Sequence, residues 1–232
     1  MLLAVVVGAW AMIFMTALMR GMVDEMIEDG IRHLPGHVQL HHPDYRDDPS
    51  IGNSLREPGG DLAAALKNPL VTAHTSRLRV PAMISSERAS RGVTLLGVDP
   101  TEELAMGFET ERLLTGRFLE GSEDPGLVVG RKLLERLETD PGKRVVLMSQ
   151  DPGNRVADRG FRIVGVYSAR LEALEERFVY AGLDTVQAML GTPGLVSEIA
   201  ALGDDYRDVD ALEALLREAA PREAEVLPWY RI

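Results

Sequence analysis

Two histidines followed by a run of aspartates are the side chains of this sequence that most resemble metal ligands. His37 and His41 lie in a stretch that alternates like a β-strand, so both would share one face, and Asp44, Asp47 and Asp48 follow closely. Metal ligands normally converge from several elements, whereas one alternating strand that runs into an acidic turn is commonly a solvated face. We therefore predict no metal site.

Pairs of acids are the second candidate chemistry. They are Glu102–Glu103, Glu109–Glu111 and Asp204–Asp205. General acid and base catalysis would need two carboxyl groups within about 5 to 10 Å of each other across a cleft. Solvated surface is the simpler interpretation of each pair, and a membrane-anchored enzyme that uses one of them is kept as a minor hypothesis. The sequence has no Walker A motif, no G-x-G-x-x-G, no G-x-S-x-G and no H-E-x-x-H. We predict a protein that is not an enzyme, has no ATPase of its own and needs no cofactor.

Composition narrows the class of protein. The chain has 232 residues, 45% of them hydrophobic, a formal net charge of −11 and no cysteine. This predicts a folded protein of one large or two small domains. The acidity disfavours nucleic acid as a partner, and the lack of cysteine excludes thiol catalysis and disulfides.

The first 19 residues form an apolar run in which Thr16 is the one plainly polar side chain. A helix of that length covers about 28 Å, close to the roughly 30 Å hydrocarbon core of a bilayer. A signal peptide or a buried core helix are the alternatives, but the run lacks a basic start, a convincing cleavage site and a polar stripe. We predict a transmembrane helix.

The apolar run continues into an amphipathic segment, which we call the stalk. Acids interleave with apolar residues at a helical period, and those apolar residues are Met22, Val23, Met26, Ile27 and Ile31. The stalk is either a mechanical link or a juxtamembrane helix that packs on its own domain. Its acidity disfavours the cytoplasmic side, so the large domain should lie outside the membrane. We expect that a basic cytoplasmic leader preceded residue 1.

The rest of the chain alternates helices and strands around a strand-rich middle. Asp184 and Gln187 are spaced as a capping box at the start of one helix. A polar, glycine-containing segment, 149–160, lies between two strands and predicts a hairpin loop, which either docks a partner or is plain surface. Expected strands are 71–84, 93–98, 127–129, 144–148, 161–167, 178–180, 196–202 and 225–227, and expected helices are 62–67, 131–138, 184–191 and 209–219. The pattern predicts an α+β domain interrupted by a β-rich insertion.

Several short motifs, in this order, resemble one family. They are GHVQLHHPDYRDDPS, RGVTLLGVDPTEE, LLTGRFLEGSEDPGLVVGRKLLERL, FRIVGVYSA and a closing PW, after the N-terminal span. The chain is similar to the ABC transporter permeases that include MacB, LolC and LolE, and FtsX. The resemblance runs from Met1 to Trp229 and rests on the order and spacing of these motifs.

The resemblance implies a first transmembrane helix followed by a periplasmic domain of the bacterial inner membrane. It divides the chain into a helix and stalk (1–33), a ferredoxin-like porter-type part (34–90 and 176–232) and an inserted β-rich part (91–175). It also implies a fragment that stops before the second span. In LolC-like members the hairpin docks a lipoprotein carrier, and the matching residues here are Asp151, Asn154, Arg155, Asp158 and Arg159.

The implied function is coupling of ATP hydrolysis on a partner subunit to extraction or export of a hydrophobic cargo, either a lipoprotein or an amphipathic small molecule. The implied partners are a separate ABC ATPase, a second permease copy or paralogue, the membrane and a periplasmic carrier or adaptor. The alternative is an FtsX-like regulator that binds and activates a periplasmic cell-wall hydrolase.

Overall fold

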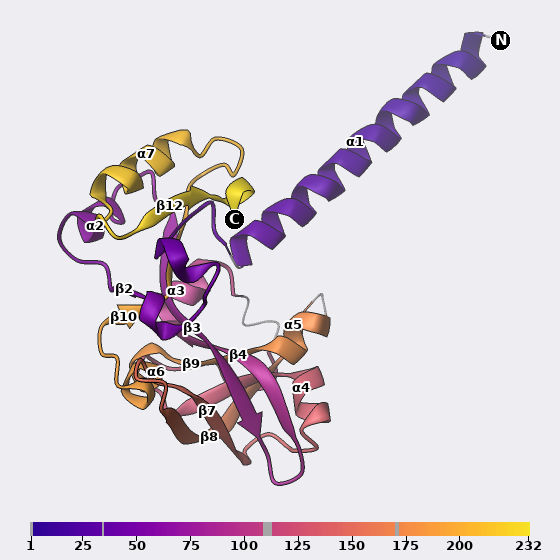
Figure 1. The fold of residues 1–232 in the computed structure, drawn as a ribbon. Helices are drawn as coiled ribbons and strands as arrows, with labels where there is room; N and C mark the ends of the chain where they lie inside the picture. Colours follow the sequence, from indigo (N-terminus) through magenta and orange to yellow (C-terminus); the bar gives the residue numbers. More distant parts are fainter. Residues whose placement is uncertain (1, 34, 109–112, 170–171) are drawn as a thin grey trace.

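The computed structural model describes residues 2–33, 35–108, 113–169 and 172–232, and a long N-terminal helix, α1 (Leu2–His33), projects from the rest of the chain (Figure 1). Pro35 is the first proline of the sequence, so nothing interrupts the helix before it. The helix is followed by Gly36 at φ +69°, whose N–H donates to the carbonyl of Ile31 over 2.8 Å. The prediction that the apolar helix continues through the acidic stalk is confirmed.

One mixed sheet organises the described part of the domain. Its strand order is β12-β1-β11-β3-β4-β9-β6-β8-β5, and β7 joins it by pairing with β3 and β8. A separate small pair is made by β2 and β10. The strands are β1 (Val38–His41), β2 (Leu55–Arg56), β3 (Ala73–Ser85), β4 (Ser90–Val98), β5 (Leu113–Gly116), β6 (Gly126–Gly130), β7 (Arg144–Gln150), β8 (Val156–Tyr167), β9 (Phe178–Gly182), β10 (Leu195–Val196), β11 (Glu198–Leu202) and β12 (Glu225–Pro228).

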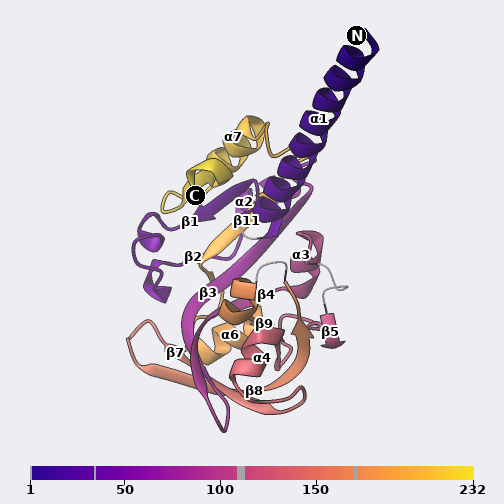
Figure 2. The ribbon, with the colours of Figure 1, turned by 90° about the vertical axis from the view of Figure 1, so that its right-hand side faces the viewer.

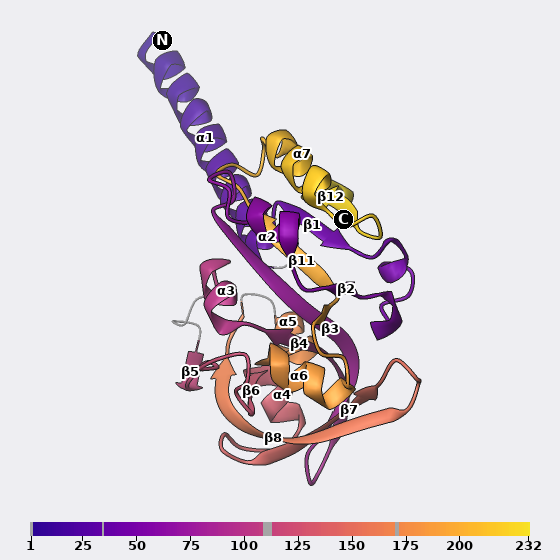
Figure 3. The ribbon, with the colours of Figure 1, turned by 90° about the vertical axis from the view of Figure 1, so that its left-hand side faces the viewer.

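The long strand β3 connects two halves of the domain. Its first residues pair with β11, and its remaining residues pair with β4 and, at the end, with β7. We call the part around β1, β11, β12 and the start of β3 the stalk-side half, because α1 joins it, and the part around β4 to β9 the distal half. Figures 2 and 3 show β3 running from one half to the other.

Helices cover the sheet in both halves. In the stalk-side half α7 packs on β12 and α2, and in the distal half α6 packs on β3, β4, β8 and β9 while α4 contacts α5. The helices after α1 are α2 (Gly60–Ala65), α3 (Pro100–Ala105), α4 (Arg131–Arg136), α5 (Glu172–Arg177), α6 (Leu183–Leu190) and α7 (Asp210–Ala219), with short 3-10 turns η1 (Pro43–Tyr45), η2 (Ile51–Asn53) and η4 (Trp229–Arg231).

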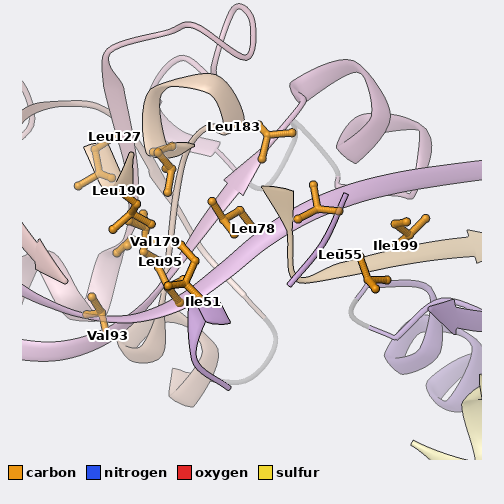
Figure 4. Packing of buried hydrophobic residues seen from close by; sticks show 14 of the residues in the cluster. Ile51, Leu55, Leu78, Val93, Leu95, Leu127, Val179, Leu183, Leu190 and Ile199 are labelled. Atoms are coloured by element: carbon orange, nitrogen blue, oxygen red, sulfur yellow. The ribbon is translucent and has the colours of Figure 1, made fainter. Parts of the chain in front are cut away.

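Among the described residues, one hydrophobic cluster runs through both halves, beside two smaller clusters. It includes Leu40 and Ile199 from the stalk-side half and Leu95, Leu127 and Val179 from the distal half, all 0% exposed. Figure 4 shows several of these side chains between the elements. Because apolar burial is continuous, the two halves are joined by packing as well as by β3.

Most predicted strands and helices are present within a few residues of their expected bounds. The capping box is wrong, because Gly182 precedes α6 without a side-chain cap, while Asp184 accepts from Ser122 and Gln187 contacts Glu57. Two helices were not predicted, α3 and α5. The sequence-based division assigns residues 176–190 to the porter-type part. In the structure β9, which lies within this range, pairs with β4 and β6 of the distal half.

Candidate functional site

The hairpin between β7 and β8 ends in a tightly hydrogen-bonded turn. Asp151 accepts from the backbone N–H groups of Gly153 and Arg155 at 2.8 and 2.9 Å, and Asn154 takes the left-handed conformation at φ 58°. The Arg155 guanidinium adds a 2.7 Å ion pair to Asp151. Hydrogen bonds from Arg155 hold the pKa of Asp151 below its usual range. The tip is therefore a preformed surface.

The five predicted docking residues divide between the turn and a strand. Asp151, Asn154 and Arg155 form the turn, whereas Asp158 and Arg159 lie in β8, opposite Met148 and Leu147. Arg159 also reaches the carbonyl of Thr185 on α6, at 3.4 Å. Asp151, Asn154 and Arg155 therefore lie at the tip of the hairpin. Arg159 instead connects the hairpin to α6 in the distal half.

An open groove of about 810 Å³ lies beside the hairpin tip. Its walls come from η2, the middle of β3 and the hairpin, and they include Ile51, Val80, Met148 and Pro152. Two apolar side chains at the groove are notably exposed, Val156 at 72% and Met83 at 49%. The sequence did not predict this groove, because its walls are distant along the chain. A valine, Val156, within the largely polar segment 149–160 was the one signal in the sequence.

The predicted stalk residues have different environments. Met22 and Val23 are exposed, whereas Ile31 is buried against the domain. Met26 and Ile27 belong to α1, but their side chains lie outside the part of the chain that the structure describes. The apolar side of the stalk therefore packs on the domain at its end and is open to a partner or lipid nearer the span.

The membrane segment itself has the expected character. Val7–Asp24, a window that overlaps the start of the stalk, is the one helix segment among the described residues that is long and apolar enough to cross a bilayer, and none of that window is buried. The Thr16 hydroxyl donates to the carbonyl of Met12 at 2.8 Å, so its polar group is satisfied within the helix.

A buried ion cluster links β3, β11 and α3, and sequence analysis missed it. Arg77 on β3 donates to Glu103 on α3 at 2.8 and 2.9 Å and lies 3.4 Å from Glu198 on β11. All three side chains are almost completely buried. Burial alone would lower the pKa of Arg77, but the Glu103 carboxylate outweighs it and raises the pKa. The expectation that Glu103 is solvated surface is wrong, because α3 turns it inward.

The histidine strand is also not a solvated face. His37 and His41 are 2% and 1% exposed, because β1 lies between β11 and β12. Among the residues that the structure describes, no three His, Asp or Glu side chains are grouped as a metal would require. Asp204 and Asp205 lie on the surface, and the pair Glu109 and Glu111 lies outside the described residues.

The glycines of the family-like motifs meet in the distal half. A Cβ on Gly116 would collide with the carbonyl of Val164, and one on Gly165 would collide with the carbonyl of Arg117. Gly116 also has φ +82°, which favours glycine. These two glycines therefore allow the close contact of β5 with β8.

An apolar helix that projects from a mixed α/β domain is the arrangement of a membrane-anchored domain that works outside the lipid. A family model described as the MacB-like periplasmic core domain matches residues 1–219. The chain belongs to this family and is a MacB-like periplasmic domain of an ABC transporter permease. No curated protein matches the chain.

Two solved structures share the fold. The extracellular domain of the ABC-type transporter YknZ from Gram-positive bacteria is similar at a TM-score of 0.56 and 15% identity, over 82% of this chain and 98% of that one. The periplasmic region of MacB from Actinobacillus actinomycetemcomitans is similar at a TM-score of 0.57 and 15% identity, over 85% of this chain and 91% of that one.

Proposed function

We propose that this chain transmits ATP-driven movement of membrane helices to a domain outside the bacterial inner membrane. The ATP is hydrolysed on a separate subunit, and the movement drives extraction or export of a hydrophobic cargo, a lipoprotein or an amphipathic small molecule. The observation that carries the proposal is the unbroken course of α1 from the apolar window Val7–Asp24 to His33. An α-helix keeps its backbone hydrogen bonds internal, so it can tilt as a rigid rod.

The junction of α1 with the sheet supports this role. Ile31 is 5% exposed, and a Cβ on Gly36 would lie 3.0 Å from the carbonyl of Ala201, so the turn packs closely on β11. The Arg77–Glu103–Glu198 cluster then joins β3 and β11 to α3. Because β3 continues from this cluster into the distal half, movement at the helix end would reach the distal half without being absorbed by a flexible linker.

We also propose that the stalk-side half is a ferredoxin-like porter-type unit. Its strands are ordered β12-β1-β11-β3 and connected as β1-α2-β3 and β11-α7-β12, which is the βαββαβ arrangement. The distal half is inserted between β3 and β11. The pairing of β9 with β4 and β6 favours ending the insertion after α6 rather than near residue 175.

The hairpin tip is the proposed contact for a periplasmic carrier or adaptor protein. The rigid turn at Asp151–Arg155 and the neighbouring groove with exposed Met83 and Val156 support this role. Preformed surfaces bind with a smaller loss of conformational entropy.

Photo-crosslinking tests this contact. In one variant of the permease a photoreactive amino acid replaces Asn154, and in the matched control it replaces Asp140, which lies in another exposed turn. Both variants are irradiated in native membranes. We expect crosslinks to a carrier or adaptor from position 154 alone. Crosslinks to a cell-wall hydrolase or its activator would favour the FtsX-like regulator. Equal labelling from both positions would contradict docking at the hairpin.

A further inference from the structure

The stalk makes a lateral contact with the domain before it reaches its end. Asp24 accepts hydrogen bonds from Arg207 Nη2 at 2.7 Å and from the Tyr206 hydroxyl at 3.2 Å. Both partners lie in the loop between β11 and α7. We call Asp24, Tyr206 and Arg207 the lateral contact.

The loop side of the lateral contact is fixed to the sheet. The backbone N–H of Gly203 donates to His37 Nδ1 at 2.9 Å, and the Trp229 indole donates to the carbonyl of Tyr206 at 2.7 Å. The Tyr206 and Trp229 rings also meet edge to face, with centroids 5.7 Å apart. His37 directly precedes β1, and Trp229 directly follows β12. A movement of Tyr206 would therefore also move these two strands at the edge of the sheet.

The helix is therefore attached at two points. One is the turn at Ile31 and Gly36, and the other is Asp24, seven residues earlier or about 10 Å along the helix axis. Two separated attachments fix the angle of a rod, whereas the turn alone leaves the rod free to pivot.

The two attachments differ in strength. Ile31 is buried and the turn is part of the chain, whereas the side chains of Asp24 and Arg207 are 48% and 56% exposed. Exposed ion pairs are weak and are screened by salt. The lateral contact is the attachment that opens first when the helix is pulled.

We propose that the lateral contact is a releasable lock on the tilt of the stalk. Closed, it holds α1 at one angle to the sheet, so that movement of the span is passed on directly. Open, it leaves α1 free to pivot about the turn at Gly36. The proposal rests on the proposed transmission function and adds a second, uncoupled state to it.

Distances between two spin labels test the lock. The sequence has no cysteine, so cysteines introduced at Met19, which is 62% exposed, and Glu218, on the surface of α7, can be labelled without background. Met19 is 14 residues from the end of α1 at His33, or about 21 Å along the helix axis, so a tilt of about 10° moves it by about 4 Å. The 232-residue chain is measured in lipid nanodiscs.

We expect one narrow distance distribution for the parent protein and a broadened or shifted one, by about 4 Å, for Asp24→Ala and for Arg207→Ala. Exchange of the charges, Asp24→Arg with Arg207→Asp, should restore the narrow distribution, and Asp204→Ala in the same loop should leave it unchanged. Parent-like distributions for both single variants would overturn the lock, and so would failure of the exchange to restore it. No ATPase is needed, so this result is separate from that of the proposed function.

Discussion

Arg77 is the residue that holds the buried ion cluster of β3, β11 and α3 together. It neutralises Glu103 and approaches Glu198 where water does not reach. We predict that Arg77→Leu lowers the free energy of unfolding by about 3–5 kcal/mol, since it removes the cation paired with the buried Glu103 and one of the two cations beside Glu198. Urea denaturation of the purified domain measures this. The exposed Arg222→Leu is the control, expected within about 0.5 kcal/mol of the parent. A loss below about 1 kcal/mol for Arg77→Leu would contradict the role of the cluster.

Asp124 gives the clearest dependence of stability on pH. Burial alone would raise its pKa, but hydrogen bonds from Arg117, Glu120 and Gly126 lower it below the ordinary 3.8. A carboxylate with a lowered folded-state pKa stabilises the fold above its unfolded pKa, and this contribution is lost as pH falls through the folded value. We predict that Asp124→Asn loses about 1–3 kcal/mol at pH 7. The difference should shrink in denaturation curves as pH falls below the unfolded-state pKa and through the lowered folded-state pKa, and a difference that does not shrink in acid would argue against the ionised interaction.

At the scale of elements, the stalk must stay helical for movement to pass through it. We predict that Met22→Pro abolishes cargo release by the assembled transporter while the thermal unfolding of the domain is unchanged, because proline breaks the helix at an exposed position. Gly21→Ala is the matched control, since a Cβ there meets nothing within 4 Å and alanine favours the helix by about 0.5–1 kcal/mol. Normal release by Met22→Pro would rule out a rigid stalk.

The hairpin can be shortened without loss of its strands. Replacing residues 151–155 by Asn-Gly should keep β7 and β8 paired, because this dipeptide closes a two-residue hairpin. We predict that the shortened chain loses at least about tenfold in affinity for the proposed carrier or adaptor protein, or about 1.4 kcal/mol, and unfolds at nearly the parent temperature. Titration calorimetry checks the affinity and scanning calorimetry the fold. Unchanged affinity would move the docking site away from the tip.

Local patterns predicted the elements of this fold better than its contacts. The apolar run, the leucine spacing of α7 and the turn signals around β7 and β8 are local properties, so the sequence showed them. The burial of His37, His41 and Glu103 depends on where β1 and α3 lie in the sheet, which no local pattern encodes. The groove and the lateral contact at Asp24 likewise join residues more than 30 positions apart.

At the scale of the whole molecule, the central claim is that α1 moves relative to a neighbouring permease when ATP binds. The direct measurement is cysteine crosslinking from Met22→Cys and Val23→Cys, both exposed, to the matching stalk of the neighbouring permease in membranes. We expect different crosslinking efficiencies in ATP-bound and ATP-free membranes, while a pair of cysteines placed within the domain is unaffected. A crosslinking pattern that is the same in both states would contradict the account.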